Sequence, residues 1–253
     1  MAEDMSIESY LAAGGILSNP ANVPPRYRAE LMKLMATFVD SELAGAAGFA
    51  DIINAAPGLK ERIAAARIVL EKTDHAERVL KVMGDFGADT ARYANHHPWT
   101  ARLPRDADIA ATRSEHDMRL AVFNYPLQGW ADAVVMNLLM GRAVVVQLAE
   151  FAMVSYQPLA EAFRAIAPRE ARHAEMAEEG LANLAAEPAN RDALQASVDY
   201  WWPRVAASFG AADARKFAAL KAMGLRRSTG EELRTRWAGE AKARLEALGL
   251  TAG

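Results

Sequence analysis

The sequence has no cysteine, and this absence excludes disulfide bonds, thiolate metal sites and cysteine nucleophiles. Aromatic residues are also few, 8% of 253 residues, although hydrophobic residues as a whole make up 52% of the chain. Such a composition suits long packed helices, and the length is enough to bury a sizeable core. The formal net charge is only −3, so the chain carries no basic footprint for nucleic acid.

The chain also has little that would mark a secretory signal or a membrane span. Its first ten residues are acidic rather than basic and then apolar, so we expect no secretory signal. The most apolar stretch, 131–154, is interrupted by Asp132, Asn137, Arg142, Gln147 and Glu150. A membrane span rarely carries so many polar residues, and we therefore predict a buried helix, no membrane partner and a cytoplasmic location.

Glycine and proline are few inside the long segments and fall at breaks such as Pro24-Pro25, Ala56-Pro57-Gly58 and Gly87. Between these breaks the apolar residues recur at helical spacing. The pattern predicts four long helices, at about 26–55, 59–86, 130–154 and 158–184. The apolar stripe of the first includes Leu31, Leu34, Met35, Phe38 and Leu43, and that of the second includes Ile63, Ala66, Leu70, Val79, Val82 and Met83.

The segment between the second and third helices, 88–117, is predicted to be an irregular crossover with short helical turns. Three shorter helices are expected after the fourth, at about 192–209, 212–223 and 230–248. No stretch shows sustained two-residue alternation, so we predict no sheet. Four long helices with one long crossover form an all-α, ferritin-like four-helix bundle with additional C-terminal helices. We expect a single domain, 1–253, with the core bundle at about 26–185 and packing helices at about 190–250.

Some polar residues stand where the core of such a bundle would be. Bundles of this kind hold a di-metal site with one carboxylate from each of two helices and a Glu-x-x-His pair from each of the other two. Glu170 and His173 have that spacing and share one helix face, although a solvated, charged face would show the same pattern. Glu42 lies among apolar neighbours, and His75 lies mid-way along its helix. Together, the four residues favour a polar centre inside the bundle.

A set of ordered motifs carries a resemblance to a known family. The motifs are Ser41-Glu42, Ala56-Pro57, Phe123-Asn124-Tyr125-Pro126, Trp130-Ala131-Asp132, Ser155-Tyr156-Gln157-Pro158, Glu170-Ala-Arg-His173 and Trp201-Trp202-Pro203. From about Ser41 onward the chain resembles the catalytic alpha subunits of phenylacetyl-coenzyme A epoxidases, in the phenylacetate-catabolism family of ferritin-like proteins. The resemblance implies a di-iron monooxygenase. Such an enzyme uses dioxygen and reductase-supplied electrons to epoxidise an aromatic ring carried as a coenzyme A thioester, beside a non-catalytic helical sister subunit.

The resemblance also implies six metal ligands, of which four are present. Glu42, His75, Glu170 and His173 match the expected metal ligands, and with Lys72 they form the expected catalytic set. Lys72 stands where the second-helix Glu-x-x-His motif should supply the bridging carboxylate. Gly141 stands where the third helix should supply an acid.

Three nearby acids are candidates to compensate for the missing ligands. Glu71 and Asp74 adjoin the right positions, but each is rotated by about 100° from the helix face in question. Glu150 lies two and a half turns beyond Gly141. None of the three is expected to be a direct ligand.

The two departures change the charge of the site by about +3, so a second dication beside a protonated lysine is disfavoured. Three arrangements of Lys72 are then open. Its ammonium could pair with Glu42 and Glu170 and replace the metal, it could be neutral beside a single metal held by Glu42, His75 and Glu170, or it could point to solvent. We expect zero or one iron per chain rather than two.

Two functions from different classes follow. The chain is either a metal-free subunit that stabilises a catalytic partner or binds a ligand in the old active-site cavity, or an iron-dependent monooxygenase on an aromatic or acyl-coenzyme A substrate. A stand-alone metal-storage protein has little support, because the carboxylates are too few. The expected partners are a helical sister subunit or further copies of the chain. Tyr125, Trp130 and Asp132 could line a pocket, but we expect them to fix the start of the third helix.

Overall fold

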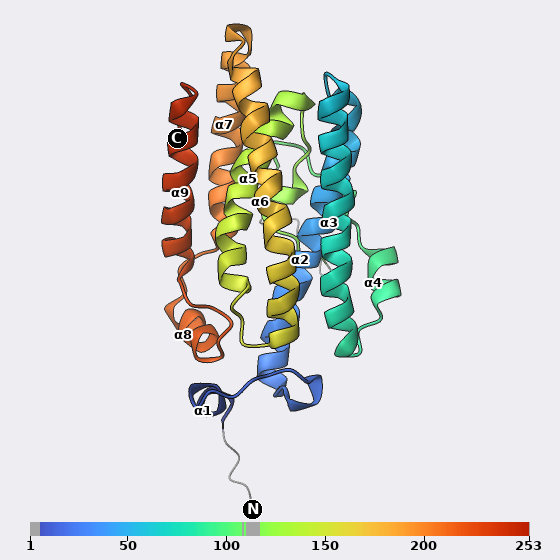
Figure 1. The fold of residues 1–253 in the computed structure, drawn as a ribbon, viewed down its shortest axis with the longest axis vertical. Helices are drawn as coiled ribbons and strands as arrows, with labels where there is room; N and C mark the ends of the chain where they lie inside the picture. The colour runs from blue at the N-terminus through green and yellow to red at the C-terminus, as the bar shows by residue number, and fades with distance from the viewer. Residues whose placement is uncertain (1–5, 108, 110–116, 253) are drawn as a thin grey trace, which may run out of the picture.

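The computed structural model describes residues 6–107, 109 and 117–252, and it confirms the all-α bundle (Figure 1). The four long helices are α2 (Pro25–Ile52), α3 (Leu59–Asp85), α5 (Gly129–Phe151) and α6 (Gln157–Ala185). Apart from helices and turns, the described residues contain one isolated β-bridge, between Leu17 and Tyr156. The predicted helix bounds agree with these within about three residues.

The ends of these helices follow from local chemistry. Pro25 and Pro158 occupy the first turns of α2 and α6, where their missing N–H groups cost nothing. Gly87 follows α3 with φ of +84°, a left-handed conformation that glycine adopts without strain and that commonly ends helices. The breaks in the sequence are therefore the breaks in the structure.

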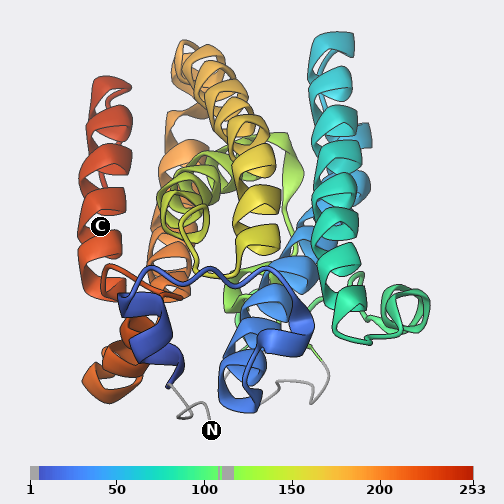
Figure 2. The same cartoon turned by 60° about the horizontal axis from the view of Figure 1, so that its bottom comes forward.

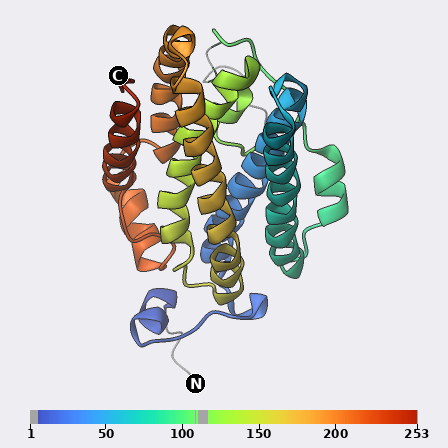
Figure 3. The same cartoon turned by 45° about the horizontal axis from the view of Figure 1, so that its top comes forward.

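Helix α2 packs mainly along α3, and α5 packs mainly along α6. The crossover between the two pairs contains the short helix α4 (Thr90–His96), which lies on the outer side of α3 (Figures 1 and 3). The C-terminal helices are α7 (Arg191–Ala206), α8 (Ala214–Ala222) and α9 (Gly230–Ala247). Of these, α7 and α9 pack against α5 on the side away from α2 and α3 (Figure 1).

An N-terminal helix, α1 (Ile7–Ala12), was not predicted from the sequence. It and the following segment run across one end of the bundle (Figure 2). The backbone N–H of Gln157 donates to the carbonyl of Leu17 over 2.8 Å and joins this segment to the start of α6. Six residues with no buried side chain give too short a pattern to recognise in advance.

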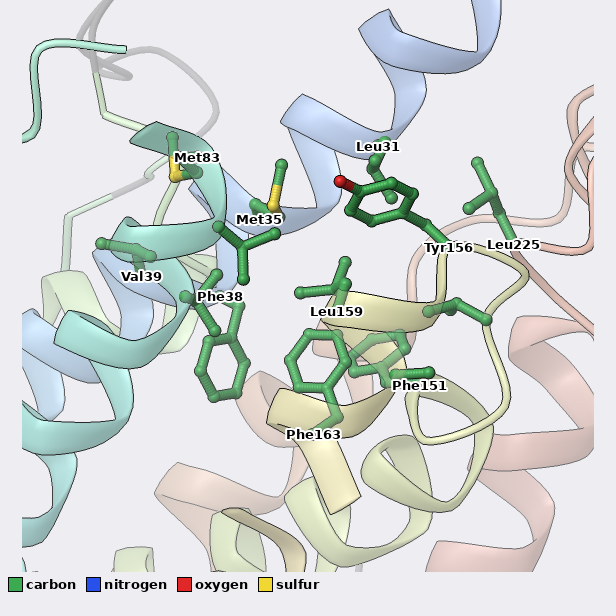
Figure 4. Packing of buried hydrophobic residues seen from close by; sticks show 14 of the residues in the cluster. Leu31, Met35, Phe38, Val39, Met83, Phe151, Tyr156, Leu159, Phe163 and Leu225 are labelled. Carbon is green, nitrogen blue, oxygen red and sulfur yellow. The ribbon is translucent and has the colours of Figure 1, made fainter. Parts of the chain in front are cut away.

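Apolar side chains from α2, α5 and α6 interlock at that same end of the bundle (Figure 4). The ring of Phe38 meets that of Phe163 edge-on, with centroids 5.0 Å apart, and Phe151 packs on Phe163 at 5.2 Å. Aromatic pairs of this geometry add to the free energy gained from burial alone. The polar centre lies further along the bundle from this apolar cluster.

The predicted stripe on α3 is wrong in its first half. Ile63 and Leu70 are 53% and 70% exposed, and Ala66 is also exposed. The inward face carries instead Ala65, Ile68, Lys72, His75 and Ala76. Because two of the inward residues are a lysine and a histidine, a search for apolar spacing assigns the wrong face to this helix.

Helix α5 is the one described helix that is long and apolar enough to cross a membrane by length and composition. Of its most apolar window, 78% is buried inside the bundle. Its apolar residues face α6 on one side and α7 and α9 on the other. This is the environment of a core helix, as the interruptions in its sequence predicted.

Candidate functional site

Lys72 lies between two carboxylates at the centre of the bundle. Its Nζ atom is 3.0 Å from Oε1 of Glu42, and 2.9 and 3.1 Å from Oε1 and Oε2 of Glu170. The side chains of the three residues are 6%, 3% and 1% exposed. The three hydrogen bonds use all three donors of the ammonium, so the buried cation is fully satisfied.

His75 completes this group from the same face of α3, one turn after Lys72. Its Nδ1 atom lies 3.1 Å from Oε2 of Glu42 and 3.0 Å from Oε1 of Glu170. Its Nε2 atom is buried without a hydrogen-bond partner among the described residues. The same pair of carboxylates therefore receives both the ammonium and the imidazole. We call these four residues, Glu42, Lys72, His75 and Glu170, the ionic centre.

The charges of the ionic centre stabilise one another. Burial alone would lower the pKa of Lys72, but attraction to Glu170 and Glu42 outweighs it and raises the pKa above its ordinary value. Burial would raise the pKa of Glu170, but Lys72 and hydrogen bonds from His173 and His75 hold it well below its ordinary value. Burial likewise opposes protonation of His75, whose pKa is raised by its hydrogen bonds to Glu170 and Glu42. With His75 protonated, two cations balance two carboxylates.

His173 lies beside the ionic centre and has a partner that the sequence did not reveal. Its Nε2 atom is 2.7 Å from Oε2 of Glu71, and its Nδ1 atom is 3.4 Å from Oε1 of Glu170. Glu71 thus reaches across from α3 to α6 although its Cα faces about 100° away from that of Lys72. Its position one residue before Lys72 was the available signal, and only coordinates could show that the side chain bends inward.

The other two candidate acids have different partners. Asp74 pairs with Arg78 at 3.0 Å and with Arg169, at the surface between α3 and α6. Glu150 accepts hydrogen bonds of 2.9 and 3.0 Å from the backbone N–H groups of Arg227 and Ser228. Glu150 therefore joins the end of α5 to the segment before α9, and neither acid contacts the ionic centre.

Gly141 faces α6 at a point where the two helices nearly touch. A Cβ atom on Gly141 would lie 3.2 Å from the Cβ and 3.3 Å from the Cα of Ala174. These separations are tighter than ordinary van der Waals contact, and one of the opposing atoms is backbone. A side chain at position 141 would therefore require Ala174 to shift by a few tenths of an ångström.

A pocket of about 240 Å³ leads from the surface to the ionic centre, and Glu42 forms part of its wall. Its inner lining is apolar and comes from α2, the crossover and α5: Leu34, Phe38, Phe123, Met140, Leu148 and Phe151. Three basic residues, Lys33, Lys216 and Arg226, also line it, together with Glu30, which pairs with Lys33 at 3.0 Å. The pocket combines an apolar interior with cationic groups, so it suits an apolar group joined to an anionic one.

Tyr125, Trp130 and Asp132 lie at the start of α5. Asp132 accepts hydrogen bonds from the backbone N–H of Gln128 at 2.8 Å and from the indole Nε1 of Trp201 at 2.8 Å, and it pairs with Arg105 at 2.9 Å. For Asp132 these contacts fix the beginning of α5 against α7, as predicted, whereas Tyr125 and Trp130 also line small pockets, the alternative that the sequence left open. Tyr125 donates to the carbonyl of Ala107 over 2.9 Å in the same region.

The comparisons with known proteins agree with this fold. The family model described as "Phenylacetic acid catabolic protein" matches residues 5–252. The chain belongs to this family. It is also similar to one component of the 1,2-phenylacetyl-CoA epoxidase of Escherichia coli strain K12, with 25% identity over 256 residues. That match spans 99% of this chain and 77% of the relative.

Because the chain belongs to the phenylacetic acid catabolic family, the question is whether the side chains of the ionic centre can bind metal ions. Glu42, His75 and Glu170 offer three ligand atoms within 4.8 Å of one another, which is compact enough for one ion. The Lys72 ammonium, however, already bonds to both of these carboxylates. A two-metal centre does not fit this donor set, because the Lys72 ammonium places a positive charge between the two carboxylates and Gly141 offers no donor atom.

Proposed function

We propose that the chain is a phenylacetyl-CoA epoxidase subunit-like protein whose di-metal centre has been replaced by an ion-pair centre. It acts in or beside the catabolism of aromatic compounds as a metal-free subunit. The observation that carries this proposal is the position of Lys72 Nζ, 2.9 to 3.1 Å from three oxygens of Glu42 and Glu170. An ammonium there supplies the positive charge that metal ions would otherwise supply to these carboxylates.

In this proposal the two carboxylates stabilise the fold through their ion pair with Lys72. Breaking a buried ion pair by removing one partner costs about 3–5 kcal/mol, because the other charge is left unpaired. Glu42 comes from α2, Lys72 from α3 and Glu170 from α6, so one set of contacts holds three helices in register. In this role the residues position helices and do not carry out a reaction.

The pocket supplies the second part of the proposal. Its apolar interior suits an aromatic acyl group, and Lys33 and Lys216 suit the phosphates of a coenzyme A carrier. We propose that this protein binds an aromatic acyl thioester or shapes the site of a catalytic partner, in a complex with a helical sister subunit or with further copies. A cytoplasmic location is part of the same proposal.

A single-metal monooxygenase is the second candidate, and one observation favours it. The donor atoms of Glu42, His75 and Glu170 lie close enough to hold one ion, and each of these residues is buried. In that case iron would supply oxygen-activating chemistry. The protein would place the two carboxylates and the imidazole around it, and Lys72 would have to release at least one of its bonds.

Two measurements on the chain test the proposal: the first tests the pocket, and the second separates the two candidates. Phenylacetyl-coenzyme A binding is measured by calorimetry on wild type and on Lys33→Glu/Lys216→Glu, with Lys242→Glu/Lys81→Glu as a surface-charge control. We expect binding that weakens at least tenfold in the pocket variant and is unchanged in the control. Epoxide formation is then assayed with iron, dioxygen and a reductant. Product formation that disappears in Glu42→Gln/Glu170→Gln would contradict the metal-free proposal.

A further inference from the structure

A second buried cluster of metal-ligating groups lies on the opposite side of α2 from the ionic centre. Asp40 is two residues before Glu42 and is therefore turned about 200° around the helix axis. It faces the crossover, which supplies His97, just after α4, and Asp117. Asp40 is fully buried, and the side chains of His97 and Asp117 are 2% and 8% exposed. Nothing in the ionic centre or the pocket explains this cluster.

The geometry around His97 is that of a ligand and not of a hydrogen-bond donor. Its Nε2 atom lies 3.3 Å from Oδ2 of Asp40 and 3.4 Å from Oδ1 of Asp117, yet neither ring nitrogen makes a hydrogen bond to a described residue. For metal–ligand bonds of about 2.0–2.1 Å, adjacent ligands at a tetrahedral ion are about 3.3–3.4 Å apart. The two separations have this length.

The groups behind the two carboxylates hold them in place, as the groups behind metal ligands commonly do. The hydroxyl of Tyr93 donates to Oδ1 of Asp40, the oxygen that faces away from His97. The guanidinium Nε of Arg119 donates to Oδ2 of Asp117 over 2.7 Å, again the outer oxygen. The inner oxygens accept backbone N–H groups of Met118 and Arg119 at 2.6 and 3.0 Å, which leaves each a second lone pair.

We propose that Asp40, His97 and Asp117 bind one divalent transition-metal ion of the zinc class. One imidazole nitrogen and two carboxylate oxygens are the three-protein-ligand set that Zn²⁺ accepts, with a fourth position for water. The ion would join the crossover at two points to the middle of α2. This site is separate from the ionic centre, so the proposal does not depend on the proposed function.

A proton on His97 is the competing occupant, since an imidazolium would balance one of the carboxylates. A proton on Nε2 can point at one oxygen only, and the ring orientation gives a hydrogen bond to neither Asp40 nor Asp117. A metal ion bonds to all three groups at once. The two occupants predict opposite results in a zinc titration.

The test uses full-length protein stripped of metal and titrated with Zn²⁺, with bound zinc counted after gel filtration. We expect one equivalent for wild type and a raised melting temperature, and the same for Lys72→Met/Glu42→Gln/Glu170→Gln, which removes the charges of the ion pair together. His97→Gln should lose the stoichiometric site. Tyr93→Phe, which keeps all three ligands, should weaken binding about tenfold through its effect on Asp40.

The metal-free melting temperature of each variant shows whether it still folds, and Tyr93→Phe keeps the test valid if His97→Gln does not. Absence of stoichiometric zinc in the wild type would overturn the proposal and leave the protonated histidine in its place. Zinc that persists in His97→Gln, or that disappears in Lys72→Met/Glu42→Gln/Glu170→Gln, would overturn it as well.

Discussion

Gly141 of α5 lies against Ala174 of α6, so closely that a Cβ on the glycine would be 3.2 Å from that of the alanine. Ala174 follows His173 directly, so this contact sits beside the ionic centre. The absence of a side chain at position 141 and the close approach of the two helices are therefore one structural fact. Together with Lys72, it leaves the centre more positive and with fewer carboxylate donors than two divalent ions require.

Substituting Gly141 by alanine should destabilise the protein despite alanine's better helix propensity. The added methyl group forces α5 and α6 apart, and overpacking of this kind costs about 1–3 kcal/mol. The matched control is Gly239→Ala in α9, where a Cβ meets nothing within 4 Å. The control should be neutral or stabilising by up to about 1 kcal/mol. Urea unfolding of both variants checks this, and equal effects would contradict the close contact.

Substituting Lys72 by methionine should be among the most destabilising single changes in the chain. It leaves Glu42 and Glu170 buried beside each other without their cation, at a cost of about 3–5 kcal/mol. The triple variant Lys72→Met/Glu42→Gln/Glu170→Gln removes the charges together and should recover much of that loss. Denaturant titrations measure both, and a triple variant no more stable than the single one would argue against a mutually dependent ion pair.

Stability should also fall on both sides of a pH window set by the ionic centre. Glu170 has a depressed pKa when folded, so its contribution is present above about 4.5 and is lost as the pH falls below that value. His75 has a raised pKa, so its contribution is present below about 6.5 and is lost as the pH rises through the folded-state pKa. The free energy of unfolding should therefore decline below about pH 4.5 and above about pH 6.5. The triple variant should show shallower declines, and identical pH profiles would contradict this origin.

Asp132 should matter for stability rather than for chemistry. Asp132→Ala leaves the indole N–H of Trp201 and the guanidinium of Arg105 without their acceptor, and hydrogen bonds to a charged group are each worth about 1.5–3 kcal/mol. Trp201→Phe removes only the indole donor to Asp132, but it also replaces a buried indole ring with a smaller ring. In thermal unfolding, the melting temperature of Asp132→Ala should lie well below that of wild type. Ligand binding per folded molecule should stay unchanged. Weakened ligand binding with unchanged stability would contradict the anchoring role.

The helices could be predicted because breaks and apolar spacing are local properties of the sequence. The inward position of Lys72 could be inferred from His75 one turn later, because residues three apart share a helix face. The spacing of apolar residues, by contrast, predicted that Ile63 and Leu70 lie inside, and this prediction was wrong because both are exposed. Apolar spacing identifies the inner face of a helix only when that face is apolar, and on α3 it is not.

Contacts made by long side chains and by the crossover lay beyond sequence reasoning. The side chain of Glu71 extends from α3 toward α6 and contacts His173, although the helical position of Glu71 does not predict this contact. Asp40 showed the same signal as Glu42, a carboxylate in an apolar part of the same helix. Its partners His97 and Asp117 lie 57 and 77 positions further along the chain, and only the fold brings them to it.

The central claim is that an ammonium replaces the metals, and counting iron and manganese tests it most directly. A parent chain and its Lys72→Glu and Glu42→Gln/Glu170→Gln variants should be purified from cells supplemented with both metals. All three should carry His97→Gln so that the second cluster does not contribute. The account predicts no stoichiometric iron or manganese on the parent chain or on Glu42→Gln/Glu170→Gln. One or two equivalents on the parent that disappear with Glu42→Gln/Glu170→Gln would contradict it.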